Sequence, residues 1–268
     1  MIAFYTPAAT GGAETQGNVF IDLYGHVLPH EIGAPLGIPL FNTQKYQLIA
    51  LAAMVVVFGL LRLNMAATRP IPPLRIFRGW CLWIRDEMVY PIMGEQEGRV
   101  FLPYFLFLFF FIAFMNLIGL VPFGGTATAS IFCTAGLALT SLFLFVGAGI
   151  QAQGAKKFLV NLVPHGLPAW LIPIMAVVEL IGLLVKPFAL MIRLFANMTG
   201  GHLVVLSFMG IIFFFADALG AFDYGVALLA VAMSVFIMII EGFVALLQAY
   251  IFTMLTIVFV AMYRHPDH

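Results

Sequence analysis

The chain has 268 residues, of which 63% are hydrophobic and 9% are charged, and its formal net charge is zero. Because an ordinary soluble domain carries roughly 25% charged residues, these values exclude a globular enzyme with one large core and indicate a polytopic integral membrane protein. The zero net charge gives no reason to expect nucleic acid as a partner. The two cysteines, Cys81 and Cys133, make neither a metal-binding pattern nor a disulfide framework.

The N-terminal part of the chain is mixed in composition and rich in Gly and Pro over residues 1–46. It lacks the basic-then-apolar order of a cleaved signal peptide, so we expect the first transmembrane helix to direct insertion. A first membrane-crossing helix is predicted over about Gln47–Leu63. Residues 64–100 then mix aromatic and aliphatic side chains with arginines and acids at near-helical spacing. This mixture predicts an amphipathic helix that lies in the membrane interface.

Two ordinary apolar spans and two unusually long ones follow. The ordinary spans are about Phe101–Val121 and Ala129–Ile150, and the long ones are about Trp170–Phe215 and Tyr224–Tyr263. At roughly 1.5 Å per residue, each long stretch would be some 60 Å long, about twice the thickness of the hydrocarbon layer. Each holds either two crossings or one strongly tilted helix, and we favour a tilted helix because neither contains an obvious polar loop. The predicted fold class is an all-α polytopic membrane protein with five crossings, the last two forming a tilted hairpin.

The basic residues set the expected orientation. Arg62 lies at the end of the first span, five arginines lie between the first and second spans, Lys156 and Lys157 follow the third, and Arg264 follows the fifth. With five crossings all of these fall on one side, and Lys45 is the basic residue left outside the spans on the other. The positive-inside rule then places the N-terminus outside and the C-terminus in the cytoplasm. We expect an extracytoplasmic segment over 1–46, a membrane domain over 47–263 with a cytoplasmic amphipathic region over 64–100, and a cytoplasmic tail over 264–268.

Arg193 lies in the middle of a long apolar segment. A permanent cation there costs about 2.5–3.5 kcal/mol on insertion scales, and arginine cannot lose its proton to escape that cost. Such a residue is kept where the charge is needed, beside a water-filled path or opposite a partner's carboxylate. Arg193 is therefore a candidate functional residue.

Polar side chains form one line on each long segment. On the first, they recur at intervals of seven and then four residues, so that all fall within roughly 40° of one line along a helix. These residues are Glu179, Lys186, Arg193 and Asn197. On the second, an interval of seven relates Ser234, Glu241 and Gln248.

A hairpin between the two long helices would bring the lines together. A turn centred near residue 220 places His202 opposite Glu241 and Arg193 opposite Gln248. A histidine beside a glutamate takes or gives protons near neutral pH, and lines of such groups inside membranes mark proton paths. A purely structural packing role for His202 or Glu241, and a solvated position at headgroup level for Glu179, are the alternatives.

The motifs around these residues resemble those of subunit a of the F-type ATP synthases. The first runs Lys186-Pro-Phe-Ala-Leu-Met-Ile-Arg-Leu-Phe-Ala-Asn-Met198, followed by Gly-Gly-His202. The second is Leu247-Gln-Ala-Tyr-Ile-Phe-Thr-Met-Leu-Thr256, and the third is Asn116-Leu-Ile-Gly-Leu-Val-Pro122. The resemblance covers nearly everything from Gln47 to Tyr263.

This resemblance implies a stator that faces a ring of c subunits, each with one membrane-embedded carboxylate, and two offset aqueous half-channels. Arg193 matches the family's essential arginine, and Asn197 and Gln248 match its polar neighbours. His202 and Glu241 occupy the pair assigned to the outer half-channel, in the reverse order from some relatives, while Glu179 matches an acid on the cytoplasmic side. Implied partners are the c ring, the subunit b peripheral stalk, the remaining synthase subunits and the lipid bilayer of a bacterial inner membrane.

No phosphate-binding loop, nucleophile constellation or metal-ligand cluster stands out in the sequence, so we expect no cofactor and no catalytic chemistry in this chain. A secondary transporter with a buried charged substrate site is the alternative function. Such transporters commonly show paired repeats and interrupted helices, and the two long segments share no evident repeat. A purely structural membrane scaffold would have no reason to keep Arg193.

Overall fold

The computed structural model describes residues 31–33, 40–65, 72–120, 127–162, 168, 170–215 and 223–265. The expected extracytoplasmic segment up to residue 30, and the hairpin turn at residues 216–222, lie outside the described residues. Two short strands that the sequence did not suggest, β1 (Glu31–Gly33) and β2 (Leu40–Phe41), pair antiparallel just before the first long helix. The rest of the regular structure among the described residues is helical.

In the described part of the chain, five helices are long and apolar enough to cross a membrane. They are α2 (Asn42–Met65), α5 (Glu95–Gly119), α6 (Ile131–Gln153), α8 (Ile172–Phe215) and α9 (Asp223–Arg264). The all-α class and the five expected spans are confirmed.

Shorter helical elements connect the spans. Helix α3 (Pro72–Trp83) continues through the π-helix η2 (Ile84–Val89) into α4 (Tyr90–Met93). The 3₁₀ turn η3 (Ala127–Ala129) precedes α6, and α7 (Ala155–Asn161) follows it. The chain changes direction at Gly94 and Gly154, whose φ angles of 76° and 81° suit glycine best because other residues meet a Cβ clash there.

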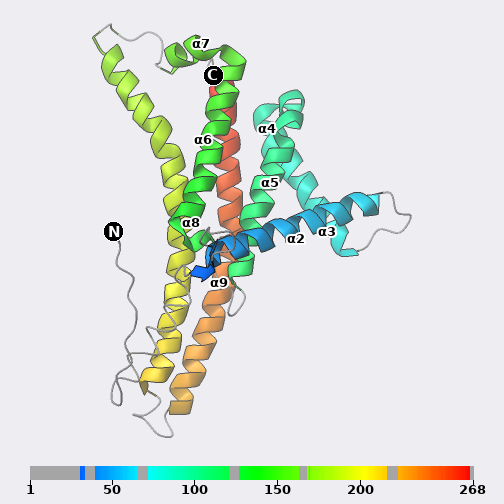
Figure 1. Cartoon of the computed structure of the whole chain (residues 1–268), viewed down its shortest axis with the longest axis vertical. Helices are drawn as coiled ribbons and strands as arrows, with labels where there is room; N and C mark the ends of the chain where they lie inside the picture. Colours follow the sequence, from blue (N-terminus) through cyan, green and yellow to red (C-terminus); the bar gives the residue numbers. More distant parts are fainter. Residues whose placement is uncertain are drawn as a thin grey trace.

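The two long segments are single helices of 44 and 42 residues. Pro187 lies inside α8. Proline removes one backbone hydrogen bond and bends a helix, and Figure 1 shows the first part of α8 inclined away from α6 and α9. Beyond this region α8 runs alongside α9. The interpretation of each stretch as one continuous helix is confirmed.

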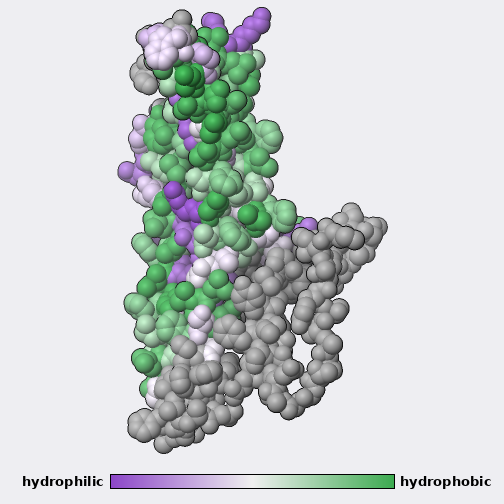
Figure 2. Space-filling model, turned by 90° about the vertical axis from the view of Figure 1, so that its left-hand side faces the viewer, coloured by the Kyte–Doolittle hydropathy of each residue, from purple (hydrophilic) through white to green (hydrophobic). Residues whose placement is uncertain are grey.

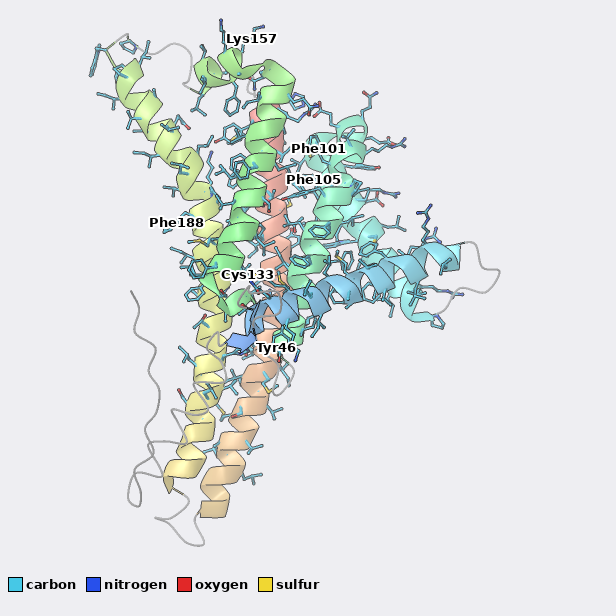
Figure 3. The ribbon with its side chains drawn as sticks, in the orientation of Figure 1. Tyr46, Phe101, Phe105, Cys133, Lys157 and Phe188 are labelled. Carbon is cyan, nitrogen blue, oxygen red and sulfur yellow. The ribbon has the colours of Figure 1, made fainter. Side chains whose placement is uncertain are left out.

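The bundle centre is formed by α5, α6, α8 and α9. Phe105, Leu108 and Ile112 recur at helical spacing on α5 and are buried, whereas Phe188 on α8 is 55% exposed and points away from the bundle (Figure 3). The amide of Asn116 on α5 donates a hydrogen bond of 3.2 Å to a backbone carbonyl of α9. The carbonyl belongs to Ala245, a fully buried small residue, and small residues let membrane helices approach closely.

Helix α2 crosses the direction of the α8–α9 pair at a wide angle (Figure 1). Its 24 residues make a helix of about 36 Å, enough for one upright crossing. Helices α8 and α9 are each longer than 60 Å at about 1.5 Å per residue, too long for an upright crossing. Because both directions cannot follow the membrane normal, an upright α2 requires a strongly inclined α8–α9 pair. The tilt stays a prediction, and this crossing supports it.

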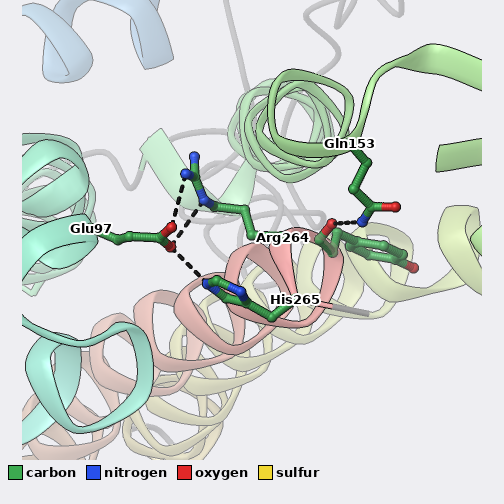
Figure 4. A network of polar contacts seen from close by, with 5 residues as sticks. Glu97, Gln153, Arg264 and His265 are labelled. Atoms are coloured by element: carbon green, nitrogen blue, oxygen red, sulfur yellow. Dashed lines mark hydrogen bonds and ion pairs between the residues drawn. The ribbon is translucent and has the colours of Figure 1, made fainter. Parts of the chain in front are cut away.

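Polar contacts gather the ends of three helices at the C-terminal end of α9 (Figure 4). Arg264 donates from Nε and Nη2 to the two carboxylate oxygens of Glu97 on α5, each at 3.0 Å. His265 Nε2 lies 3.0 Å from Glu97 Oε2. The side chain of Gln153, at the end of α6, donates to the carbonyl oxygen of Tyr263 at 2.7 Å. The start of α5 and the ends of α6 and α9 therefore share one end of the bundle, as an alternating topology requires.

Candidate functional site

His202 and Glu241 meet between α8 and α9, as the hairpin predicts. His202 Nδ1 lies 3.1 Å from Glu241 Oε1, and the side chains are only 14% and 5% exposed. Gly201 makes room for this pair, because a Cβ atom there would lie within 3.0 Å of every atom of the carboxylate group. The neighbouring Gly200 has nothing within 4 Å of a corresponding Cβ atom. The arrangement places an acid and an imidazole in proton-transfer range inside an apolar surrounding.

Gln248 pairs with Asn197 rather than with Arg193. Asn197 Nδ2 donates to Gln248 Oε1 at 3.1 Å. Asn197 lies one helical turn beyond Arg193, so the expected Arg193–Gln248 pair is replaced by this one. The predicted register was a few residues off because it assumed a turn centred at residue 220, and the packing of α8 on α9 moves the symmetry point toward the C-terminus.

Arg193 is exposed on α8, next to buried Leu194 and Leu190. Among the described residues, it has no hydrogen-bond or ion-pair partner. Asn197 is exposed on the same line. Figure 2, which views the side of the molecule on which α8 lies in Figure 1, shows hydrophilic residues in the middle of a hydrophobic surface. A fixed positive charge is therefore exposed near the middle of α8.

Lys186, the other cation of the line, is bound to α9. Its Nζ atom donates to the hydroxyl oxygen of Tyr263 at 2.8 Å. The same atom lies 4.9 Å from the ring centroid of Tyr263 and 5.3 Å from that of Phe259, which is within the range of cation–π attraction. The charge of Lys186 is thus held against α9, in contrast to that of Arg193.

Glu179 is partly exposed on the first part of α8, before Pro187. Fourteen residues separate it from Arg193, about 21 Å along a helix. Among the described residues, no hydrogen bond or ion pair reaches Glu179. His202 lies nine residues on the other side of Arg193, about 13.5 Å away. Glu179 and His202 therefore lie on opposite sides of the unpaired cation along α8.

Several buried polar atoms near this line have no protein partner. They include Ser234 Oγ, Thr253 Oγ1, Thr199 Oγ1, Asn116 Oδ1 and Gln248 Nε2. Buried polar groups are costly unless they are hydrogen-bonded, and all of these atoms except that of Asn116 lie on α8 or α9. Nothing in the sequence distinguishes Thr199 or Thr253, because a threonine in an apolar helix often bonds its own backbone. Over the described part of the chain, no group of His, Cys, Asp and Glu side chains is arranged to hold a metal ion.

Comparison with known proteins places these features in context. The family model described as ATP synthase A chain matches residues 46–261. The subunit a of ATP synthase from Myxococcus xanthus is 41% identical over 192 residues, covering 70% of this chain and 61% of that protein. The one from Chloroherpeton thalassium is 47% identical over 188 residues, covering 69% of this chain and 54% of that protein.

A third relative matches over nearly the whole chain. The protein named ATP synthase subunit a 2 from Prosthecochloris aestuarii is 36% identical over 279 aligned residues, which cover 97% of this chain and 83% of that protein. Against the other two relatives, the chain spans only about half to three fifths of their length.

Proposed function

This chain belongs to the ATP synthase A chain family, and from this premise we propose that it is the proton-conducting stator subunit of the membrane sector of an F-type ATP synthase. Its partners would be the c ring, the subunit b peripheral stalk and the other synthase subunits, in the lipid bilayer of a bacterial inner membrane. The N-terminus would lie outside and the C-terminal tail over 264–268 in the cytoplasm. The chain itself performs no ATP chemistry in this proposal.

The observation that carries the proposal is the outward-facing, unpaired guanidinium of Arg193. A cation inside a membrane without a partner is expensive, and each carboxylate of a turning c ring would neutralise it in passing. Because arginine keeps its proton, Arg193 would hold the carboxylate in its charged form without relaying the proton. The same charge repels protons and so prevents a direct leak between the two sides of the membrane.

Protons would reach and leave the ring by separate routes on either side of Arg193. From the outer side, the His202–Glu241 pair would pass a proton onto a carboxylate that has moved off Arg193. The neutral carboxylic acid then faces lipid as the ring turns. It would release the proton to water on the side of Glu179 before it meets Arg193 again. Asn197 and Gln248, hydrogen-bonded across the helices at 3.1 Å, would provide a polar environment next to Arg193.

The continuity of α8 and α9 weighs against the alternative of a secondary transporter. Substrate sites of such proteins are typically built where helices are interrupted at mid-membrane. Both helices run unbroken through the level of Arg193, Glu241 and Gln248.

Replacement of Arg193 tests the proposal. The Arg193→Ala variant should lose ATP-driven proton pumping in inverted membrane vesicles, while the complex still assembles. Arg62→Ala, at an exposed position near the end of α2, is the matched control and should pump at the wild-type rate. Wild-type pumping by the Arg193→Ala variant would contradict the proposal.

A further inference from the structure

An open apolar groove lies between α3, α5 and α9, away from the line of polar residues. It has a volume of about 560 Å³ and is lined almost entirely by apolar surface. Trp80 and Trp83 of α3 form one wall, and Phe243, Leu247 and Tyr250 of α9 form part of the other. Because a water molecule occupies roughly 30 Å³ of liquid, this volume suits a sizeable apolar group rather than one or two bound waters.

The walls of the groove are fixed by ring contacts. Trp80 meets Phe109 of α5 edge to face, with centroids 6.0 Å apart, and Trp83 meets Tyr250 with centroids 5.8 Å apart. Trp80 and Trp83 are nevertheless 39% and 44% exposed. The groove is therefore preformed but uncovered, and its exposed rings need an apolar occupant.

The exposed side of α3 carries two different edges. At about 100° per residue, Ile76, Trp80 and Trp83 fall within about 60° of one another, and Arg75 and Arg78 form a second edge about 130° away. All five residues are exposed. Among the described residues, neither Arg75 nor Arg78 has a hydrogen-bond or ion-pair partner. One flank of the helix is thus apolar and the other is cationic.

Gly79 lies between the two edges. It is exposed, and a Cβ atom built on it would have nothing within 4 Å. A ligand can therefore approach the helix backbone closely at this point, with its charged part over the arginines and its apolar part beside the tryptophans.

We propose that this face of α3 binds an anionic phospholipid of the cytoplasmic leaflet. One acyl chain occupies the groove between Trp83 and α9, the glycerol region crosses Gly79, and the phosphate binds Arg75 and Arg78. Basic side chains beside a cleft between membrane helices on the cytoplasmic side are a recurrent setting for anionic headgroups. Tryptophan at the membrane interface suits the boundary between headgroup and acyl chain.

Photolabelling tests the site on the intact membrane complex that contains this chain. The complex is reconstituted into phosphatidylcholine vesicles containing a phosphatidylglycerol with a diazirine on one acyl chain, and labelled peptides are located by mass spectrometry. We expect labels on the groove residues of α3 and α9. An excess of unlabelled phosphatidylglycerol should remove them, and the same excess of phosphatidylcholine should not. Equal competition by the two lipids would overturn the charge requirement and with it the proposal.

Paired variants separate the two edges. Each Lys or Arg near an anionic surface contributes about 1 kcal/mol, so the double variant Arg75→Gln/Arg78→Gln should lower labelling about 30-fold. Arg62→Gln on α2 is its control and should leave labelling unchanged. Trp83→Ala should shift the label out of the groove, whereas Trp170→Ala, at the other exposed tryptophan that the structure describes outside the groove, should not. Wild-type labelling in both groove variants would overturn the proposal.

A photoreactive benzoylphenylalanine at position 83 identifies the occupant directly. Crosslinking to phospholipid supports the proposal. Crosslinking to a polypeptide of the complex would instead show that a protein helix fills the groove, and would overturn it.

Discussion

Replacing Gly201 by alanine should disable the His202–Glu241 pair while leaving the helices in place. A Cβ atom at this position would lie 2.5 Å from the carboxylate carbon of Glu241, whereas ordinary contact begins at 3.4 Å. The carboxylate must therefore move by the difference, about 0.9 Å. This movement costs little because the carboxylate is the far end of a flexible side chain. The backbone of α9 does not need to shift.

The 3.1 Å contact between His202 and Glu241 does not survive such a shift. Proton transfer requires the two groups to lie within hydrogen-bond reach, about 2.6–3.2 Å between heavy atoms. A misplacement of about 1 Å in reacting groups lowers rates by up to about 100-fold. We expect the Gly201→Ala variant to slow ATP-driven proton pumping in membrane vesicles by between about 10-fold and 100-fold, with a normal amount of assembled complex by immunoblot.

Gly200→Ala is the matched control, because nothing lies within 4 Å of a Cβ atom there. Both substitutions replace a glycine inside the same helix, and alanine favours a helix over glycine by about 1 kcal/mol in each case. Any difference between them therefore reports the contact with Glu241. Equal pumping by the two variants would refute the assignment of the outer proton route to this pair.

Two further substitutions test how the helices are held together. Lys186→Met removes the ammonium from its hydroxyl partner on α9, and it should destabilise the complex by about 1.5–3 kcal/mol, as lost hydrogen bonds to charged groups do, which lowers the midpoint of thermal unfolding. Lys157→Met, at an exposed position on α7, is the control and should leave the midpoint unchanged. An equal drop in the control would contradict a stabilising role for the Lys186 contact. Arg264→Gln breaks a bidentate pair whose side chains are only 19% and 28% exposed. Its midpoint of thermal unfolding should fall more than that of Arg99→Gln, which removes an exposed pair worth about 0.2–1 kcal/mol. The reverse order would rule out a stabilising role for the partly buried pair.

The sequence predicted the helices well because long apolar runs are strong signals. All five crossings lie where the hydrophobic pattern places them, within a few residues except at the starts of α2 and α5. Helix α5 begins at Glu95 rather than near Phe101, because its first turn carries charged residues that an apolar run does not include. The π-helical segment η2 and the strand pair at Glu31–Phe41 carried no recognisable pattern.

The site was predicted in part. Residue spacing alone predicted the contact between His202 and Glu241, but it paired Gln248 with the wrong residue of α8. Two helices that cross do not keep the constant pairing register that a simple hairpin assumes. The binding of Lys186 to Tyr263 was not foreseen. Tyrosine is common at the ends of membrane helices, so its hydroxyl gave no sign of a specific role. The groove at Trp83 depends on three helices and has no signal in any one of them.

The Glu97–Arg264 pair joins the start of α5 to the end of α9, 167 residues apart. It cannot form until the last helix has been synthesised and inserted in the right direction. An α9 inserted the other way round would carry Arg264 to the opposite side of the membrane and leave a partly buried carboxylate without its cation, which is strongly unfavourable. The pair therefore closes the bundle only in a chain whose start of α5 and end of α9 lie on the same side of the membrane.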